Sequence, residues 1–167
     1  MGRKVLFLAC CHQMHELLAK DTCYKIFPQD DSPQCKLFMD LKREWDSLDE
    51  ADIQTVDLPA SEREALIEFY KEIYFNGEKV LLRHDFKELL EVSLKLLGSE
   101  LPAEKEFTWK KVGAVNKARF MAWSLCSVKA FAFSSQMDFS EETKENLQCF
   151  TLFQVTIYIP HSLMSSI

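Results

Sequence analysis

Between Val80 and Gly98 the apolar residues recur every three or four positions, and this spacing restricts what the stretch can form. A half-buried strand would need strict alternation of apolar and polar residues, whereas a helix places positions three and four apart on one face. Asp85 can cap the start, and Gly98 fits the left-handed conformation that ends many helices. The sequence therefore predicts a helix whose core-facing stripe consists of Phe86, Leu89, Leu90, Leu94 and Leu97.

The same periodicity predicts two helices before this one. In "CKLFMDLKREWDSL" the apolar residues are spaced for an amphipathic helix with Trp45 on its buried side. Further on, Ser61 and Glu64 match a capping box, in which the hydroxyl and the carboxylate each accept a backbone N–H at a helix start. We expect that helix to run to about Phe75, because Asn76 and Gly77 follow as a stop signal.

Two more helices are expected in the last third of the chain. The stretch 115–133 is apolar on more than one face, which is typical of a central helix covered by several neighbours. Ser140 is a predicted N-cap, and the two glutamates after it suit the first turn because they complement the helix dipole. Past Gln154 the β-branched run "FQVTIYIP" is also compatible with a strand, and we expect the helix to continue through it.

The predicted fold class is mainly α, a compact multi-helix domain with at most one or two short strands near the N-terminus. "KVLFLA" over 4–9 has the pattern of a short buried strand, and Met14, Leu17 and Leu18 then recur at helical spacing. A chain of 167 residues with 47% apolar residues can bury a real core as one domain. We expect a single helical domain over 1–167, with a strand–helix segment over 1–27 and a helical core over 34–159.

Charge is unevenly distributed along this chain of net charge −6. That balance argues against coating of nucleic acid by the whole surface, which needs an excess of Lys and Arg. The stretch 108–133 nevertheless contains basic residues and no acidic ones. A basic segment beside a Trp can hold a phosphate backbone and stack a base, and the alternative is a solvated helix face whose polar residues happen to be basic. The candidate DNA-binding residues are Trp109, Lys110, Lys111, Lys117 and Arg119.

The densest group of reactive side chains is "CCHQMHELLAKDTC". His12 and His15 could share a helix face, with Cys10, Cys11 or Cys23 completing a zinc site. They could also activate Cys10 or Cys11 as a nucleophile. The spacing matches no standard zinc module and no cysteine hydrolase signature. Phosphate loops and dinucleotide glycine patterns do not occur either. We therefore expect no metal site, no cofactor and no catalytic residues, with a Cys10 or Cys11 enzyme as the remaining alternative.

The lengths of the apolar runs bear on where in the cell we expect this protein. The run near the N-terminus has about seven residues, too few for a secretory signal, and no run approaches the roughly 20 residues that span a bilayer. The six cysteines form no CxxC pair, so we interpret them as reduced thiols. The expectation is a protein of the nucleus or cytoplasm without a membrane partner.

Four segments in this order resemble a known family: "VLFLACCHQMHEL", "KLFMDLKREW", "LRHDFKELLEVSLKLLG" and "VGAVNKARFMAWSLCSVKAFAF". Together they are similar to transposon-derived proteins of invertebrate genomes related to DDE transposases of the hAT type. In that family an RNase H-like sheet carries three metal-binding acids, and a helical domain is inserted before the third. Cys10 matches the Cys of the family's CxxH motif, with Gln13 in place of the His, and the segment 117–120 resembles its "ARW" stretch with Phe120 in place of Trp.

The resemblance implies a helical insertion region without the catalytic acids, two of which would precede Met1 and one of which would follow Ile167. Strand transfer needs the whole carboxylate set with its two metal ions, so the resemblance implies no enzyme activity. We expect a non-catalytic, transposase-derived helical domain that acts by protein–protein interaction, with a protein partner or a homo-oligomer. The alternatives are a DNA-binding module using segment 109–119 and the cysteine enzyme described above.

Overall fold

The computed structural model describes residues 11–27, 36–79, 84–101, 107–112 and 122–164. Within these ranges the chain is helical and contains no strand, which confirms the predicted mainly α class. The strand expected over 4–9 lies outside the described residues. None of the helices in the described ranges has both the length and the apolar character needed to cross a bilayer.

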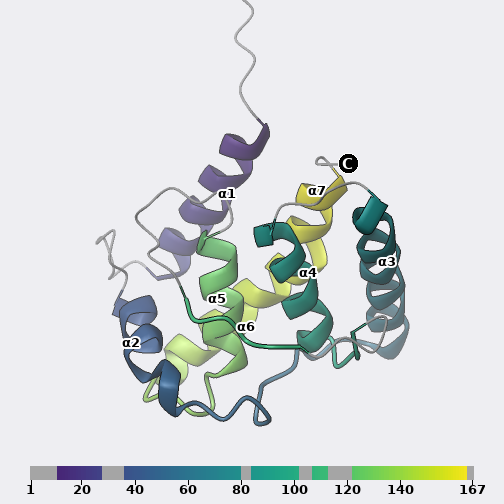
Figure 1. The fold of residues 1–167 in the computed structure, drawn as a ribbon. Coiled ribbons are helices and arrows are strands. Elements are labelled where there is room, and N and C mark those ends of the chain that lie inside the picture. Colours follow the sequence, from purple (N-terminus) through teal and green to yellow (C-terminus); the bar gives the residue numbers. More distant parts are fainter. Residues whose placement is uncertain (1–10, 28–35, 80–83, 102–106, 113–121, 165–167) are drawn as a thin grey trace, which may run out of the picture.

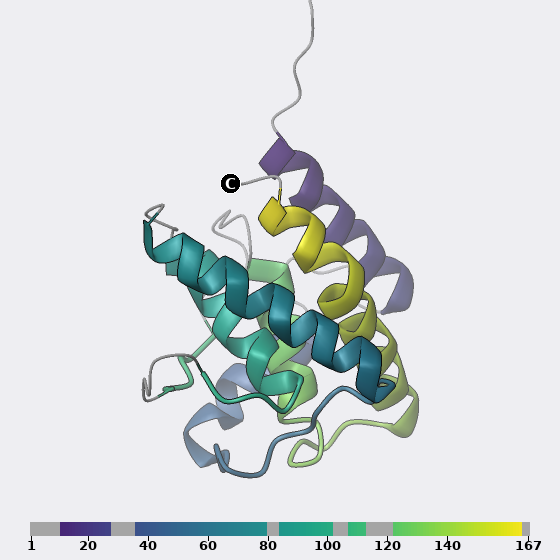
Figure 2. The ribbon, with the colours of Figure 1, turned by 90° about the vertical axis from the view of Figure 1, so that its right-hand side faces the viewer.

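Helices of three turns or more dominate the fold, and they pack around a common core (Figure 1, Figure 2). A 3₁₀ turn at Trp45–Ser47 follows α2, and a π-helical turn at Gln154–Tyr158 joins α6 to α7. In chain order the α-helices are α1 (Cys11–Ile26), α2 (Lys36–Glu44), α3 (Ala60–Lys79), α4 (His84–Leu96), α5 (Ala122–Ala132), α6 (Glu141–Phe153) and α7 (Ile159–Met164).

Helix α5 lies at the centre of the packing. It contacts α1, α2, α4 and α6, and its residues from Cys126 to Ala132 are all buried. Figure 1 shows α5 between α2 on one side and α4 on the other. A helix covered from several directions must be apolar on several faces, so the prediction of a central helix is confirmed for its described part. Residues 115–121 of the predicted stretch lie outside the described ranges.

Helix α4 confirms both the predicted stripe and its predicted end. The five stripe residues, Phe86, Leu89, Leu90, Leu94 and Leu97, are each at most 2% exposed. Gly98 has a φ of 73°, the Ser99 N–H donates to the Leu94 carbonyl at 2.9 Å, and the Gly98 N–H donates to Lys95 at 2.9 Å. This pair of hydrogen bonds is a Schellman motif, which satisfies carbonyls that the helix end would leave unpaired.

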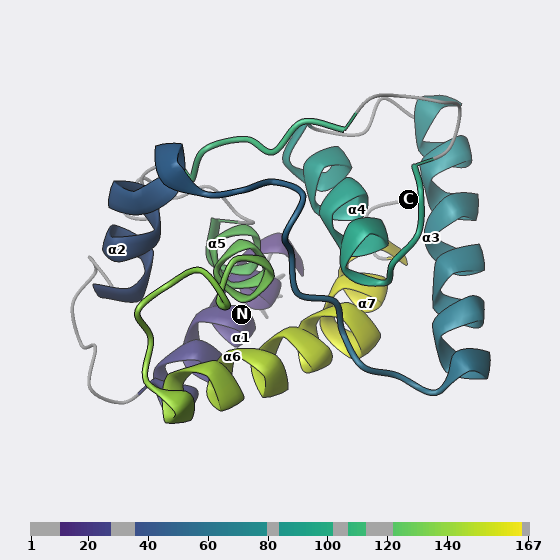
Figure 3. The same cartoon turned by 90° about the horizontal axis from the view of Figure 1, so that it is seen from below.

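A segment without helix or strand, 48–59, turns at 50–52, crosses one end of the bundle and contacts the carboxyl ends of two helices (Figure 3). The Gln54 N–H donates to the Ala132 carbonyl of α5 at 2.7 Å, and the Val56 N–H donates to the Leu96 carbonyl of α4 at 2.8 Å. Val56 and Leu58 are buried in the core. The segment therefore supplies donors to helix ends while it adds apolar area to the core.

Three predicted helix boundaries were wrong. Helix α3 begins at Ala60, with the Arg63 N–H donating to the Pro59 carbonyl at 3.0 Å, so Ser61 lies inside the first turn and is not the N-cap. The Pro59 carbonyl thus accepts the first hydrogen bond of the helix, and Pro59 itself precedes the first helical residue. The same helix continues past Gly77 to Lys79, since one glycine inside a helix costs only about 1 kcal/mol. Helix α2 ends earlier than expected, and Trp45 is half-buried in the 3₁₀ turn that follows.

The predicted start of α6 is confirmed, and so is the continuation of the helix beyond Gln154. Ser140 is the N-cap, and its Oγ accepts the Thr143 N–H at 3.2 Å. At Gln154–Tyr158 the helix widens, because the Ile159 N–H donates to the Gln154 carbonyl, one residue further back than in an α-helix. The helical form then resumes as α7.

The widened turn has a cause in the sequence. Pro160 has no N–H and in an α-helix its ring would collide with the Thr156 carbonyl. With π-helical spacing the Val155 carbonyl would accept the N–H of residue 160, but residue 160 is a proline and has no N–H. The buried Tyr70 hydroxyl of α3 donates to that carbonyl at 2.7 Å instead. One side chain of α3 thus completes the backbone hydrogen bonding of another helix.

Candidate functional site

The structure places the predicted base-stacking residue in the interior. Trp109 is 5% exposed and belongs to an aromatic cluster with Trp45, Phe107 and Phe133. Its ring centroid lies 4.8 Å from that of Phe133 and 4.9 Å from that of Phe107, both in edge-to-face geometry. While this cluster is intact, the ring of Trp109 has no free face on which a nucleotide base could stack.

Two of the predicted DNA-binding lysines are on the surface. Lys110 lies 4.0 Å from a Glu88 carboxylate oxygen, and Lys111 Nζ forms an ion pair with Asp46 at 2.7 Å. Both side chains are more than 40% exposed, so these ion pairs contribute little to stability and leave the ammonium groups accessible. Lys117 and Arg119 lie outside the described residues. The ring of Trp109 is thus buried, whereas the side chains of its neighbours Lys110 and Lys111 are exposed.

Lys129, the last basic residue of the same stretch, is buried. Its Nζ forms an ion pair with Glu88, donates to the Lys110 carbonyl at 2.7 Å and lies 5.6 Å from the centroid of the Trp45 ring. The side chain is 2% exposed, so these partners replace its hydration. This basic residue holds α4, α5 and the segment 107–112 together.

The candidate metal-binding and nucleophilic residues are mostly beyond what the structure describes. Cys10 lies outside the described ranges, and nothing is described of the Cys11, His12 and His15 side chains. Among the described residues no group of three or more His, Cys, Asp or Glu is arranged to hold a metal ion. Cys126 is a free thiol in the core, and burial raises the pKa of that thiol to about 12.

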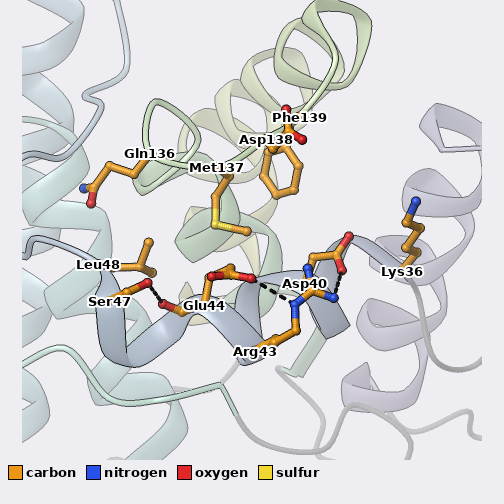
Figure 4. A pocket seen from close by; sticks show the side chains of 10 residues that line it. All are labelled: Lys36, Asp40, Arg43, Glu44, Ser47, Leu48, Gln136, Met137, Asp138 and Phe139. Carbon is orange, nitrogen blue, oxygen red and sulfur yellow. Dashed lines mark hydrogen bonds and ion pairs between the residues drawn. The ribbon is translucent and has the colours of Figure 1, made fainter.

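A surface groove lies between α2 and the loop that leads into α6. Its larger part has a volume of about 650 Å³ and lies between residues 36–48, which comprise α2 and the 3₁₀ turn after it, and residues 136–139 (Figure 4). An adjoining part of about 420 Å³ lies between Ile26 and Phe27 after α1 and the first turn of α6. The two parts share Lys36, Asp40, Asp138 and Phe139, so we treat them as one groove, named the α2/α6 groove below.

Carboxylates outnumber cations in the α2/α6 groove. Arg43 is held by Asp40 at 2.8 Å and by Glu44 at 2.9 Å, which raises the pKa of its guanidinium through the hydrogen bond to Glu44 and the charge of Asp40. Figure 4 shows these three side chains along one wall. Asp138 and Glu142, by contrast, are exposed and make no ion pair within the described part of the chain. The groove therefore presents uncompensated negative charge.

A single side chain fixes the wall opposite α2. Gln136 accepts the Asp49 N–H at 2.7 Å and donates to the carbonyls of Asp49 and Asp52 at 2.9 and 2.6 Å. These bonds tie the loop before α6 to the segment after α2, at a sequence separation of 87 residues. Sequence reasoning missed Gln136 and the groove, because no motif marks residues that meet only through the fold.

Helix α1 presents a second apolar surface. Met14, Leu17 and Leu18 recur at helical spacing, as the sequence indicates, and they are 55%, 56% and 50% exposed. The side of the helix that faces the core includes Ala19, which is 1% exposed. Contiguous exposed apolar side chains of this kind are typical of protein contact surfaces.

Comparison of the chain with models of protein families, with curated proteins and with solved structures found no match. The resemblance to hAT-type transposases thus stays a prediction that depends on the four segments quoted above.

Proposed function

We propose that this chain is a non-catalytic helical domain that binds a segment of another protein in the α2/α6 groove. The observation that carries the proposal is the groove itself, whose larger part is mainly polar and whose smaller part combines apolar and polar side chains. Phe139 and Phe27 are half-buried there, and Met137 points from the loop toward α2 (Figure 4). Apolar side chains next to polar and charged ones are common in protein-binding surfaces.

The walls of the groove favour recognition without large rearrangement. One wall is a helix, and the other is held by the three hydrogen bonds of Gln136. A preformed groove loses less conformational entropy on binding than a flexible one, so a short extended segment can bind with useful affinity. The exposed stripe of α1 supports the same general function, since it offers a further surface for protein contacts.

The test is a selection of random 12-residue peptides displayed on phage, with purified chain as target. Ser47→Trp places a bulky side chain in the groove from an exposed position, and Ala51→Trp is the matched control because Ala51 is exposed on the same connection but does not line the groove. We expect peptides that bind the natural chain and Ala51→Trp but lose binding to Ser47→Trp. A selection that yields no peptide with this pattern refutes the proposal.

DNA binding remains a separate prediction. The exposed Lys110 and Lys111 favour it, whereas the burial of Trp109 removes the expected stacking contact. Its test is the affinity for a DNA duplex at increasing salt, which should fall steeply, and fall less steeply after replacement of both lysines by Gln. Undetectable binding at low salt would exclude this function.

A further inference from the structure

The α2/α6 groove also indicates the chemistry of its occupant. We propose that the segment it binds carries a Lys or Arg side chain close to a large apolar side chain. This inference rests on the proposed function, and it deepens that proposal by naming the class of partner sequence.

The charges that line the groove favour a cationic side chain in the bound segment. Four carboxylates and two cations line the two parts of the groove, and Arg43 is engaged by two of the carboxylates, Asp40 and Glu44. Asp138 and Glu142 have no ion-pair partner within the described ranges. A partner cation placed between them would complete pairs that the free chain lacks, whereas a partner carboxylate would be repelled.

The N-terminus of α6 does not reverse this preference. Helix N-termini commonly attract anions, because their first N–H groups are unpaired. Here Ser140 already accepts the Thr143 N–H, and Glu141 and Glu142 already place negative charge in the first turn. Of these two carboxylates only Glu142 lines the groove, so an anionic ligand there would have to approach Glu142, which adds to the preference for a cation.

The smaller part of the groove requires an apolar group as well. Ile26 and Phe27 from the end of α1 lie across from Phe139, and all three are half-buried. A partner side chain in this volume of about 420 Å³ would remove apolar area from water, which a lone cation cannot do. The half-buried rings of Phe27 and Phe139 would also attract a nearby ammonium or guanidinium group through cation–π interaction. Both features together point to a basic and apolar segment.

The experiment uses the groove-dependent peptides from the phage selection as synthetic, fluorescein-labelled probes. Anisotropy titrations compare each peptide with its Lys/Arg→Gln form, against the natural chain and against an Asp138→Asn, Glu142→Gln double variant. Glu141→Gln is the matched control, because Glu141 occupies the same turn but does not line the groove and is paired with Lys144. Melting curves verify that every variant is folded.

We expect the selected peptides to contain a basic residue, and the Gln forms to bind about five to ten times more weakly. The double variant should weaken binding of the basic peptides by a similar factor and should remove most of the difference between the two peptide forms, whereas Glu141→Gln should leave both unchanged. Groove-dependent peptides without basic residues, or peptides indifferent to the double variant, would overturn the inference and leave the proposed function standing. If no groove-dependent peptide is found, the proposed function fails and this inference fails with it.

Discussion

Replacement of Tyr70 by Phe tests the structural account of the π-helical turn. The change removes one oxygen atom and leaves the ring in place, so the core keeps its volume. It deprives the Val155 carbonyl of its donor, and that carbonyl lies in a part of the helix where residue 160 is a proline without an N–H. Val155 and Tyr70 are both 0% exposed, so water cannot replace the lost bond without a rearrangement. An orphaned buried acceptor costs about 1 to 3 kcal/mol.

The assay is thermal and urea unfolding of the natural chain, Tyr70→Phe, Pro160→Ala and the double variant. A loss of about 2 kcal/mol lowers Tm by about 4 to 8 °C for a domain of this size. Pro160→Ala restores an N–H that can donate to the freed carbonyl. We therefore expect Tyr70→Phe to cost at least about 0.5 kcal/mol less in the Pro160→Ala background, which is the size of coupling expected for residues that share a partner.

The pH dependence of the same variants gives an independent check. Burial raises the pKa of the Tyr70 phenol above its ordinary value of 10.0. A weak acid whose pKa is raised in the folded state contributes its full stability below the unfolded pKa, and that stability declines as the pH rises past about 10. The natural chain should therefore lose more stability than Tyr70→Phe between pH 9 and pH 11. Strictly additive free energies in the four-variant cycle, together with identical slopes against pH, would refute the reasoning.

Three other substitutions or treatments have outcomes that follow from local contacts. Glu88→Gln should cost about 3 kcal/mol or more, because it leaves the buried Lys129 ammonium without its counter-charge, and Lys129→Met combined with Glu88→Leu should cost much less in urea unfolding. Gly98→Ala should cost about 1 kcal/mol for backbone reasons alone, since its Cβ would meet nothing within 4 Å, and Gly98→Asn should cost less. Iodoacetamide at neutral pH should label the exposed Cys149 well before the buried, protonated Cys126, and residue-resolved mass spectrometry would expose the opposite order.

Features set by local sequence were predictable from the sequence. The stripe of α4, the left-handed Gly98 and the cap at Ser140 depend on residues within one or two turns of each other, and the structure confirms all three. The capping box predicted at Ser61 is also a local signal, and it was wrong. The helix begins one residue before Ser61, at Ala60, where the Pro59 carbonyl accepts the first hydrogen bond. Local signals thus identify helices more reliably than they identify helix ends.

Features that join distant residues were not predictable. Tyr70 meets Val155 across 85 residues, Asp49 meets Gln136 across 87, and Lys129 meets Glu88 across 41. Nothing in the neighbourhood of Gln136 in the sequence distinguishes it from a solvated surface residue. The burial of Trp109 also depends on a distant residue, since its ring packs against Phe133 in the turn that follows α5.

The acids of the α2/α6 groove differ physically from the charges that hold the fold. Glu88 pairs with the buried Lys129, and loss of the Glu88 carboxylate leaves the Lys129 ammonium buried without a counter-charge. Asp138 and Glu142 are exposed and unpaired within the described ranges, so folding gains little from Asp138, and it gains from Glu142 only the attraction to the α6 dipole, about 0.3 to 1 kcal/mol. Effects of those two substitutions on binding can therefore be attributed to recognition, because the scaffold that presents them depends on Gln136 and the helices and not on their charge.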